Sequence, residues 1–303
     1  MRSIRRTLAI AALPLLAAFQ PAQPVEWTQD GYPRWSDAQM ALPALPAPPP
    51  GATVIDMNLN GYVFGIKLID ADYDGWAGPR GADGTGDYAL RSDLSTAGLG
   101  ALLRKLRVWA VTTGTWDAAG LHPRTHLQQN RDKKRRRVEM LYDYGADTVA
   151  VSVIPPNGSQ GVPPASPAER FSAEDTLSGL FSVVVRRALM GVGACEGTIP
   201  VFDSKQHYNL RLVDRGARKD WKKDGLRVPA RDCDIYYEPV SGFDPEDLPD
   251  ADEAATPVKV VLAEIGGLDV PVRFSYKLSG FKAVIKVDEL RLQTPDGRVI
   301  DID

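Results

Sequence analysis

The sequence is poor in the residue types that most often carry chemistry, with two cysteines and three histidines among 303 residues. A zinc site draws Cys, His and acidic ligands from short spacings, and neither Cys195 nor Cys233 has a partner at such a spacing. The Gly-x-Ser-x-Gly turn of many hydrolases is missing, and the glycines between Gly191 and Gly197 do not have the dinucleotide-binding spacing. We therefore predict no cofactor, no catalytic residues and no enzymatic activity.

A surplus of basic residues is also missing. The chain has 36 Lys and Arg against 39 Asp and Glu, for a formal net charge of −3 at pH 7. Domains that bind nucleic acids are generally basic, because their side chains neutralise phosphates. This balance argues against a nucleic-acid partner.

Long hydrophobic runs are absent beyond the N-terminus, so no later stretch has the length of about 20 apolar residues that a membrane-spanning helix needs. Residues 1–23 place Arg2, Arg5 and Arg6 before an apolar segment and then small residues. This order is typical of a secretory signal peptide. We expect export, cleavage of this segment, and a mature protein that does not span the membrane.

The two cysteines both lie in the part expected to be exported. An even number of cysteines in an oxidising compartment predicts one disulfide between Cys195 and Cys233. Two unpaired buried thiols are the alternative.

The rest of the chain divides into a linker and one domain. Residues 24–52 are rich in Pro and Ala, as in ALPALPAPPP, and predict an extended linker. From residue 53 to residue 303, apolar and polar residues alternate repeatedly, as in Ile55, Met57 and Leu59. This pattern predicts a mainly β fold with a single large curled antiparallel sheet, β-spiral or half-barrel-like, whose curling protects its edges.

One segment near 172–190 has helical spacing instead. Ser172 and Asp175 resemble a capping box, and Gly191 is placed to end the helix. The apolar positions of this predicted amphipathic helix are Leu177, Leu180, Phe181, Val184 and Ala188.

The segment Asp70–Gly86 is expected to be a loop, and it contains a weak calcium candidate. Asp70, Asp72 and Asp74 occupy the first, third and fifth positions of a calcium loop, and Gly75 the sixth. The twelfth position, where a Glu should close the site, is Gly81. A solvated loop without a metal is the alternative.

A basic run follows at residues 131–137. It could attract lipid headgroups, lipopolysaccharide phosphates or an acidic protein, or it could be a charged hairpin end that discourages edge pairing. The cations of this candidate anionic-surface site are Arg131, Lys133, Lys134, Arg135, Arg136 and Arg137.

The histidines suggest no metal site. His122 and His126 are four residues apart, but Pro123 and the local alternation favour a strand, and a third ligand is missing. His207 alternates with apolar neighbours, which predicts an exposed strand histidine.

Several stretches between Thr53 and Leu292 carry a resemblance to a known family. They include Gly61-Tyr-Val-Phe-Gly65, Leu121-His-Pro123, CEGTIPVFDSKQHYNLRL and ARDCDIYYEPVSGF. The layout resembles the bacterial domain-of-unknown-function family 3108 of exported, periplasmic envelope proteins, in its alphaproteobacterial form. The resemblance implies a curled β fold like that of envelope β-spiral proteins and lipoprotein carriers, and no catalytic residues. Ser204 departs from the pattern, because similar proteins often have Gly in that turn.

Three functions are consistent with these features. The first is a non-catalytic periplasmic protein of envelope maintenance, whose curled sheet binds an amphipathic ligand such as a lipid, or an envelope protein. The second is a structural interaction module without a ligand cavity, which binds a partner through the acidic segment Asp244–Thr256 or a sheet edge. The third is a hydrolase of envelope polymers, which would need an active site that the sequence does not assemble.

Overall fold

The structure is a computed structural model that describes residues 25–29, 31–97, 106–132, 135–278 and 281–303. It is mainly β, as the alternation predicts. The strands are β1 (Glu26–Trp27), β2 (Pro33–Arg34), β3 (Thr53–Val63), β4 (Ile66–Ala77), β5 (Gly86–Thr96), β6 (Arg107–Trp116), β7 (Leu121–Asn130), β8 (Arg137–Asp143), β9 (Thr148–Ile154), β10 (Thr198–Phe202), β11 (His207–Lys223), β12 (Leu226–Ser241), β13 (Val258–Ile265), β14 (Leu268–Leu278), β15 (Phe281–Gln293) and β16 (Val299–Ile302). The helical segments are α1 (Asp37–Met40), α3 (Pro167–Phe171), α4 (Thr176–Val185), η1 (Arg186–Met190), η2 (Pro245–Asp247) and α5 (Ala251–Ala255).

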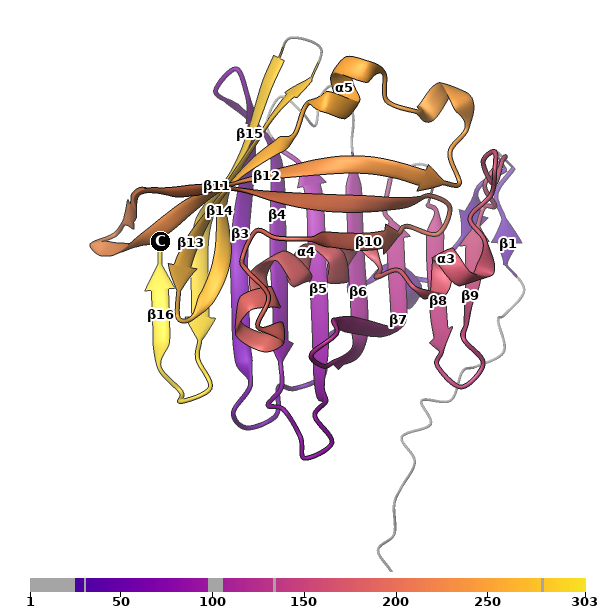
Figure 1. Ribbon diagram of the computed structural model, residues 1–303. Coiled ribbons are helices and arrows are strands. Elements are labelled where there is room, and N and C mark those ends of the chain that lie inside the picture. The colour runs from indigo at the N-terminus through magenta and orange to yellow at the C-terminus, as the bar shows by residue number, and fades with distance from the viewer. Residues whose placement is uncertain (1–24, 30, 98–105, 133–134, 279–280) are drawn as a thin grey trace, which may run out of the picture.

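All strands from β3 onward form one antiparallel sheet, which has fourteen strands within the described ranges. Its order is β10-β11-β12-β13-β14-β15-β3-β4-β5-β6-β7-β8-β9, with β16 also paired to β15. The sheet curls so that β10, β11 and β12 cross in front of β5 to β8, with α4 between the two layers (Figure 1). The strands β9 and β10 remain its two ends, so the sheet does not close into a barrel.

The inner face of this curl holds the main core. Ile55, Met57 and Leu59 of β3 point inward at every second position, as in a regular strand. In β15 the inward residues are Val287, Leu290 and Leu292, because a bulge after Val287 shifts the alternation by one residue. Apolar residues of α4 complete the core from the middle of the curl. The fully buried members of this cluster include Ile55, Met57, Leu90, Phe181, Val184, Ala263, Ile265, Val270 and Leu292.

The predicted helix is present, but it starts later than its sequence pattern indicated. Ser172 ends the short helix α3, and Asp175 is the residue that caps α4. Both α3 and α4 begin with a side-chain cap, so the chain makes two helices where one was expected. The turn of η1 extends α4 to Met190, and Gly191 ends it with a left-handed conformation at φ 70°, as predicted.

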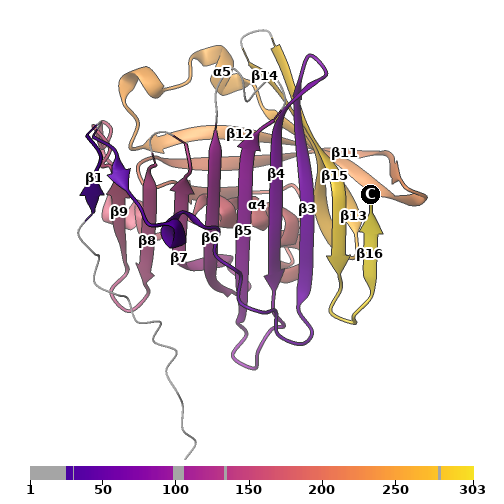
Figure 2. The same cartoon turned by 180° about the vertical axis from the view of Figure 1, so that it is seen from behind.

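The segment expected to be a free linker packs on the sheet. Its described residues run along the outer face, on the side opposite to α4 (Figure 2). The backbone oxygens of Met40 and Pro46 accept hydrogen bonds from the indoles of Trp109 and Trp76. Composition had indicated an extended chain with little to bury, but it did not reveal the outward-facing indoles that bind this segment.

One further local prediction, the exposure of His207, is wrong, and two turns are resolved in detail. His207 is buried, with 7% of its surface exposed, because it is the first residue of β11 and pairs with both Phe202 and Ser241. The hairpin between β10 and β11 forms despite Ser204, which adopts a φ of 92° that favours glycine. The acidic segment Asp244–Thr256 contains η2 and α5.

Candidate functional site

An apolar cavity of about 490 Å³ lies between the inner faces of β3–β5 and β13–β15, beside α4. Its walls come from strands that lie far apart in the sequence and become neighbours where β15 pairs with β3. The lining residues are Leu59, Ile69, Ala71, Asp72, Tyr73, Ser92, Leu94, Leu177, Leu180, Val258, Phe274, Ser275, Tyr276, Ala283 and Ile285. Most of them are apolar, so the cavity suits a hydrocarbon chain better than a polar substrate.

Small side chains leave this space unfilled. Ala71 on β4 and Ala283 on β15 both line the cavity, where larger residues would close it. Several lining residues, among them Ile69 and Tyr276, keep part of their surface accessible to solvent. The cavity is therefore not sealed from solvent.

The helix α4 forms one boundary of the cavity through Leu177 and Leu180. Its first turn is fixed by Asp175, whose carboxylate is fully buried and accepts hydrogen bonds from the backbone N–H of Leu177 and Ser178 at 2.9 and 3.3 Å. A carboxylate at this position satisfies free N–H groups and interacts favourably with the helix dipole.

A network of polar side chains from the sheet surrounds the same carboxylate. Thr112 of β6 donates to Asp175 at 2.8 Å, and Nδ1 of His126 on β7 lies 2.9 Å from it. Ser178 donates to the other carboxylate oxygen at 2.6 Å and lies 2.8 Å from the hydroxyl of Tyr88 on β5. Burial would raise the pKa of Asp175, but the His126 ring and these hydrogen bonds lower it below its usual range.

This network connects α4 to three strands, and it is closed to solvent. Thr112, Asp175 and Ser178 are all 0% exposed. A carboxylate, an imidazole and a hydroxyl in contact would suit acid–base chemistry, but a substrate has no access to them here. Their arrangement fits a structural role, the attachment of α4 to the inner face of the sheet.

A second acid extends the attachment to the other end of the sheet. Glu174 forms a bridge with Val201 of β10, and Ser182 donates to both of its carboxylate oxygens at 2.8 and 2.7 Å. Burial raises the pKa of Glu174 to about 8, and the nearby charge of Asp175 adds to this, although the Ser182 bonds oppose it. At neutral pH, Glu174 is therefore largely protonated.

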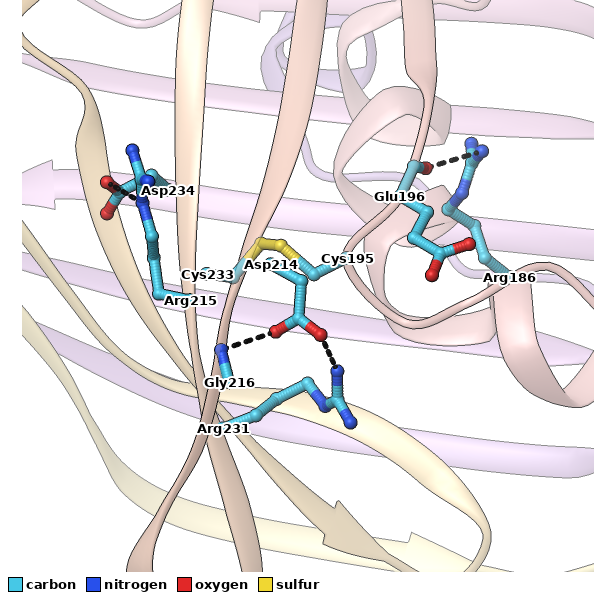
Figure 3. Close-up of a disulfide and its surroundings, with 9 residues drawn as sticks. All are labelled: Arg186, Cys195, Glu196, Asp214, Arg215, Gly216, Arg231, Cys233 and Asp234. Atoms are coloured by element: carbon cyan, nitrogen blue, oxygen red, sulfur yellow. Dashed lines mark hydrogen bonds and ion pairs between the residues drawn. A yellow bond between two sulfur atoms is a disulfide. The ribbon is translucent and has the colours of Figure 1, made fainter.

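The disulfide between Cys195 and Cys233 is present, as predicted. It joins the chain after η1 to the middle of β12, and both cysteines are buried (Figure 3). Ion pairs flank it on the outer surface, such as Arg215 with Asp234 at 2.8 Å. The bond fixes the exit of the helical segment to the sheet.

Comparison with known proteins identifies the family. A family model described as a protein of unknown function, DUF3108, matches residues 80–278. This chain belongs to the DUF3108 family. No sequence among curated proteins matches it. Among solved structures, it is similar to a β-barrel-like protein of DUF1849 from Brucella abortus, with a TM-score of 0.43 and 11% identity over 80% of this chain and 97% of that one.

The segment of this DUF3108 protein that contains the weak calcium candidate is not a loop at its three aspartates. Asp70, Asp72 and Asp74 lie within strand β4, and the loop starts only after Ala77. Alternate strand residues lie about 7 Å apart along the chain, so the carboxylates cannot wrap around one ion as in a calcium loop. In the described ranges, no group of three or more acidic, His or Cys side chains could hold a metal ion.

Those carboxylates have other partners on the outer face of the sheet. Asn58 donates to Asp70 at 3.0 Å and to Asp72 at 2.9 Å. Arg91 of β5 pairs with Asp74 at 2.6 Å. The aspartates of β4 are therefore part of the cross-strand bonding of the sheet.

The basic run lies at the turn between β7 and β8. Lys133 and Lys134 are outside the described residues. Arg131 pairs with Asp93, and Arg137 pairs with Glu139 at 2.6 Å, so the charges at the two ends of the run are compensated within the protein. The backbone oxygen of Arg135 accepts from Trp35 at 2.6 Å, and that of Arg136 accepts from Asn130 at 2.8 Å.

The apolar cavity of this DUF3108 protein was not predicted residue by residue. Most of β4 lies in the segment that was expected to be a loop. Alternation on β3 and β14 indicated which of their residues face inward. It did not indicate that β15 lies beside β3, and only that pairing brings Ala71 and Ala283 to one space.

Within the described residues, no helix is long and apolar enough to cross a membrane.

Proposed function

We propose that this protein binds an amphipathic molecule, with the hydrocarbon part in the cavity between β3–β5 and β13–β15. The observation that carries the proposal is the cavity itself, which is apolar, about 490 Å³ in volume and partly open to solvent. Binding pockets for small molecules have volumes of roughly 300–1,000 Å³ and mostly apolar walls. A binding role agrees with the buried position of the Asp175 network, which offers no accessible acid or base.

The proposal includes export and a role in maintaining the cell envelope. Two features support an oxidising, extracytoplasmic location: the disulfide between Cys195 and Cys233, and the signal-like residues 1–23, which lie outside the described residues. An exported protein with a hydrocarbon-binding cavity is suited to hold lipids or lipid-linked molecules of the envelope. Mass spectrometry of organic extracts from protein purified out of the periplasm should detect such a molecule at stoichiometric amounts.

The cavity is tested directly with Ala71→Phe. We expect this variant to bind the neutral fluorescent probe N-phenyl-1-naphthylamine at least tenfold more weakly than the natural protein. The phenyl group would displace roughly 60 Å² of apolar contact, which at about 25 cal/mol per Å² corresponds to a tenfold change. Fluorescence titration gives both affinities, and competition with a long-chain fatty acid shows that a physiological type of chain uses the same space.

Ala150→Phe is the matched control. Ala150 is an exposed strand residue on β9, so the same substitution there leaves the cavity unchanged. Equal probe binding by Ala71→Phe and Ala150→Phe variants, both folded, would refute the cavity proposal. A stoichiometric protein partner and a lipid-free extract would instead support the interaction module.

A further inference from the structure

The β14–β15 hairpin has like charges directly opposite one another on its outer face. Arg273 is the ladder partner of Lys286, and Lys277 is the ladder partner of Lys282. Like charges at directly opposed positions destabilise an antiparallel pair. Their repeated occurrence on one hairpin points to a role beyond the stability of the hairpin.

Strand β13 adds another cation to the same face. Lys259 is the ladder partner of Ser275, so its side chain lies on the same side of the sheet as Arg273 and Lys277. We refer to these five cations as the basic face: Lys259, Arg273, Lys277, Lys282 and Lys286. In the part of the chain that the structure describes, none of the five forms an ion pair with a carboxylate, although Asp234 of β12 is the ladder partner of Lys259 and itself pairs with Arg215.

The basic face is concave and adjoins the apolar cavity. Two hollows, of about 570 and 240 Å³, are both lined by Lys259, Ser275 and Lys282. The smaller hollow shares Ser275 and Tyr276 with the cavity. The hydrocarbon site and the cations therefore lie on the two sides of one hairpin.

Exposed apolar side chains lie at the same end of the molecule. Val63 pairs with Ala283, which places the β3–β4 turn beside the end of the β14–β15 hairpin. In that turn Phe64 is 75% exposed and Ile66 is 44% exposed. Both hairpins point to the upper end in Figure 1 and in Figure 2.

We propose that this end of the molecule docks on an anionic lipid surface, with the basic face against phosphate headgroups and the β3–β4 turn inserted among them. The combination of cations with exposed apolar residues is typical of peripheral membrane contact. The proposal builds on the proposed function, because the docked surface would present the cavity to lipid.

One observation favours a lipid surface over a nucleic acid, since the net charge of −3 opposes both of these anionic partners. Insertion of the exposed Phe64 and Ile66 side chains into a membrane interface is favourable, because it removes apolar surface from water. These side chains cannot contact phosphates through hydrogen bonds or charge. Thr256, which ends α5, lines the smaller hollow together with Lys277 and Lys282, so the acidic helix α5 lies close to the hairpin.

The test is sedimentation of the protein with vesicles of phosphatidylcholine alone or mixed with phosphatidylglycerol. We expect binding only to the mixed vesicles, and weaker binding as salt is raised. Each lysine near an anionic surface contributes roughly fivefold to partitioning, so Lys277→Gln combined with Lys282→Gln should weaken it about thirtyfold. Because the change removes an opposed like-charge pair, it should not lower the melting temperature.

The matched control removes two lysines from another hairpin. Lys219 and Lys222 are exposed on β11, and Lys219→Gln with Lys222→Gln should leave vesicle binding unchanged. The proposal would be overturned if both double variants lost vesicle binding equally. It would also be overturned if the natural protein bound neutral vesicles as well as mixed ones, or bound single-stranded DNA more tightly than vesicles. The two proposals are tested independently. The Ala71→Phe variant should still bind vesicles, and the Lys277→Gln/Lys282→Gln variant should still bind the neutral probe.

Discussion

The buried carboxylate of Asp175 makes the strongest test of how α4 is held in the sheet. Asp175→Ala removes the N-cap of α4 and the acceptor for Thr112, His126 and Ser178 in one step. Because α4 contributes Leu177 to the cavity wall, the same change should also weaken binding of the neutral probe.

The expected loss of folding stability is the sum of two contributions. The cap alone contributes about 1 kcal/mol. The buried polar groups left with fewer partners add roughly 1–3 kcal/mol, since Thr112 can still bond to His126 and Ser178 to Tyr88. We therefore expect the free energy of unfolding to fall by about 2–4 kcal/mol.

Asp250→Ala provides the comparison within the same chain. Asp250 caps α5 through the backbone N–H of Glu253 at 2.8 Å, but it is exposed and has no buried network. Its loss should cost only about 0.5–1 kcal/mol. Urea unfolding of both variants, followed by circular dichroism with the disulfide intact, measures the difference. Equal losses would show that the buried network adds nothing and would refute the reasoning.

Two further predictions concern acid–base behaviour and the disulfide. The native state keeps a proton on Glu174 up to about pH 8, whereas the unfolded chain releases it near 4.5, so stability should fall as pH rises between these values. The free energy of unfolding should fall by at most about 1.4 kcal/mol per pH unit over this range. Glu174→Gln should remove this pH dependence from melting curves recorded across the range. An unchanged dependence in the variant would contradict the assignment to Glu174. Replacing Cys195 and Cys233 by Ala should lower the free energy of unfolding by about 4 kcal/mol, as expected for a bond across 38 residues, and urea titration that shows no loss would count against it.

The strands were predictable because burial and alternation agree along them. Ile55, Met57 and Leu59 of β3 point into the core as their spacing indicated. The helix was recognised from the spacing of Leu177 and Phe181, although its cap was misplaced because Ser172 and Asp175 are both good capping residues. Local sequence cannot decide between two caps that serve two successive helices.

The errors have a common physical cause. Asp70, Asp72 and Asp74 suggested a loop by composition, yet they tolerate a strand because Asn58 and Arg91 lie across from them. Such compensation depends on which strands are neighbours, which a single sequence does not reveal. The cavity and the basic face depend on the same pairing of distant strands and were missed for the same reason.

The pairing of β3 with β15 also sets the order in which the molecule can be assembled. Asn60 on β3 donates to Asp288 on β15, 228 residues later, while the opposite edge of β3 is paired at once by the next strand, β4. A nascent chain therefore carries one edge of β3 unpaired until its final strands have been synthesised. Unpaired strand edges favour association with other chains, so completion of the sheet removes this site of association.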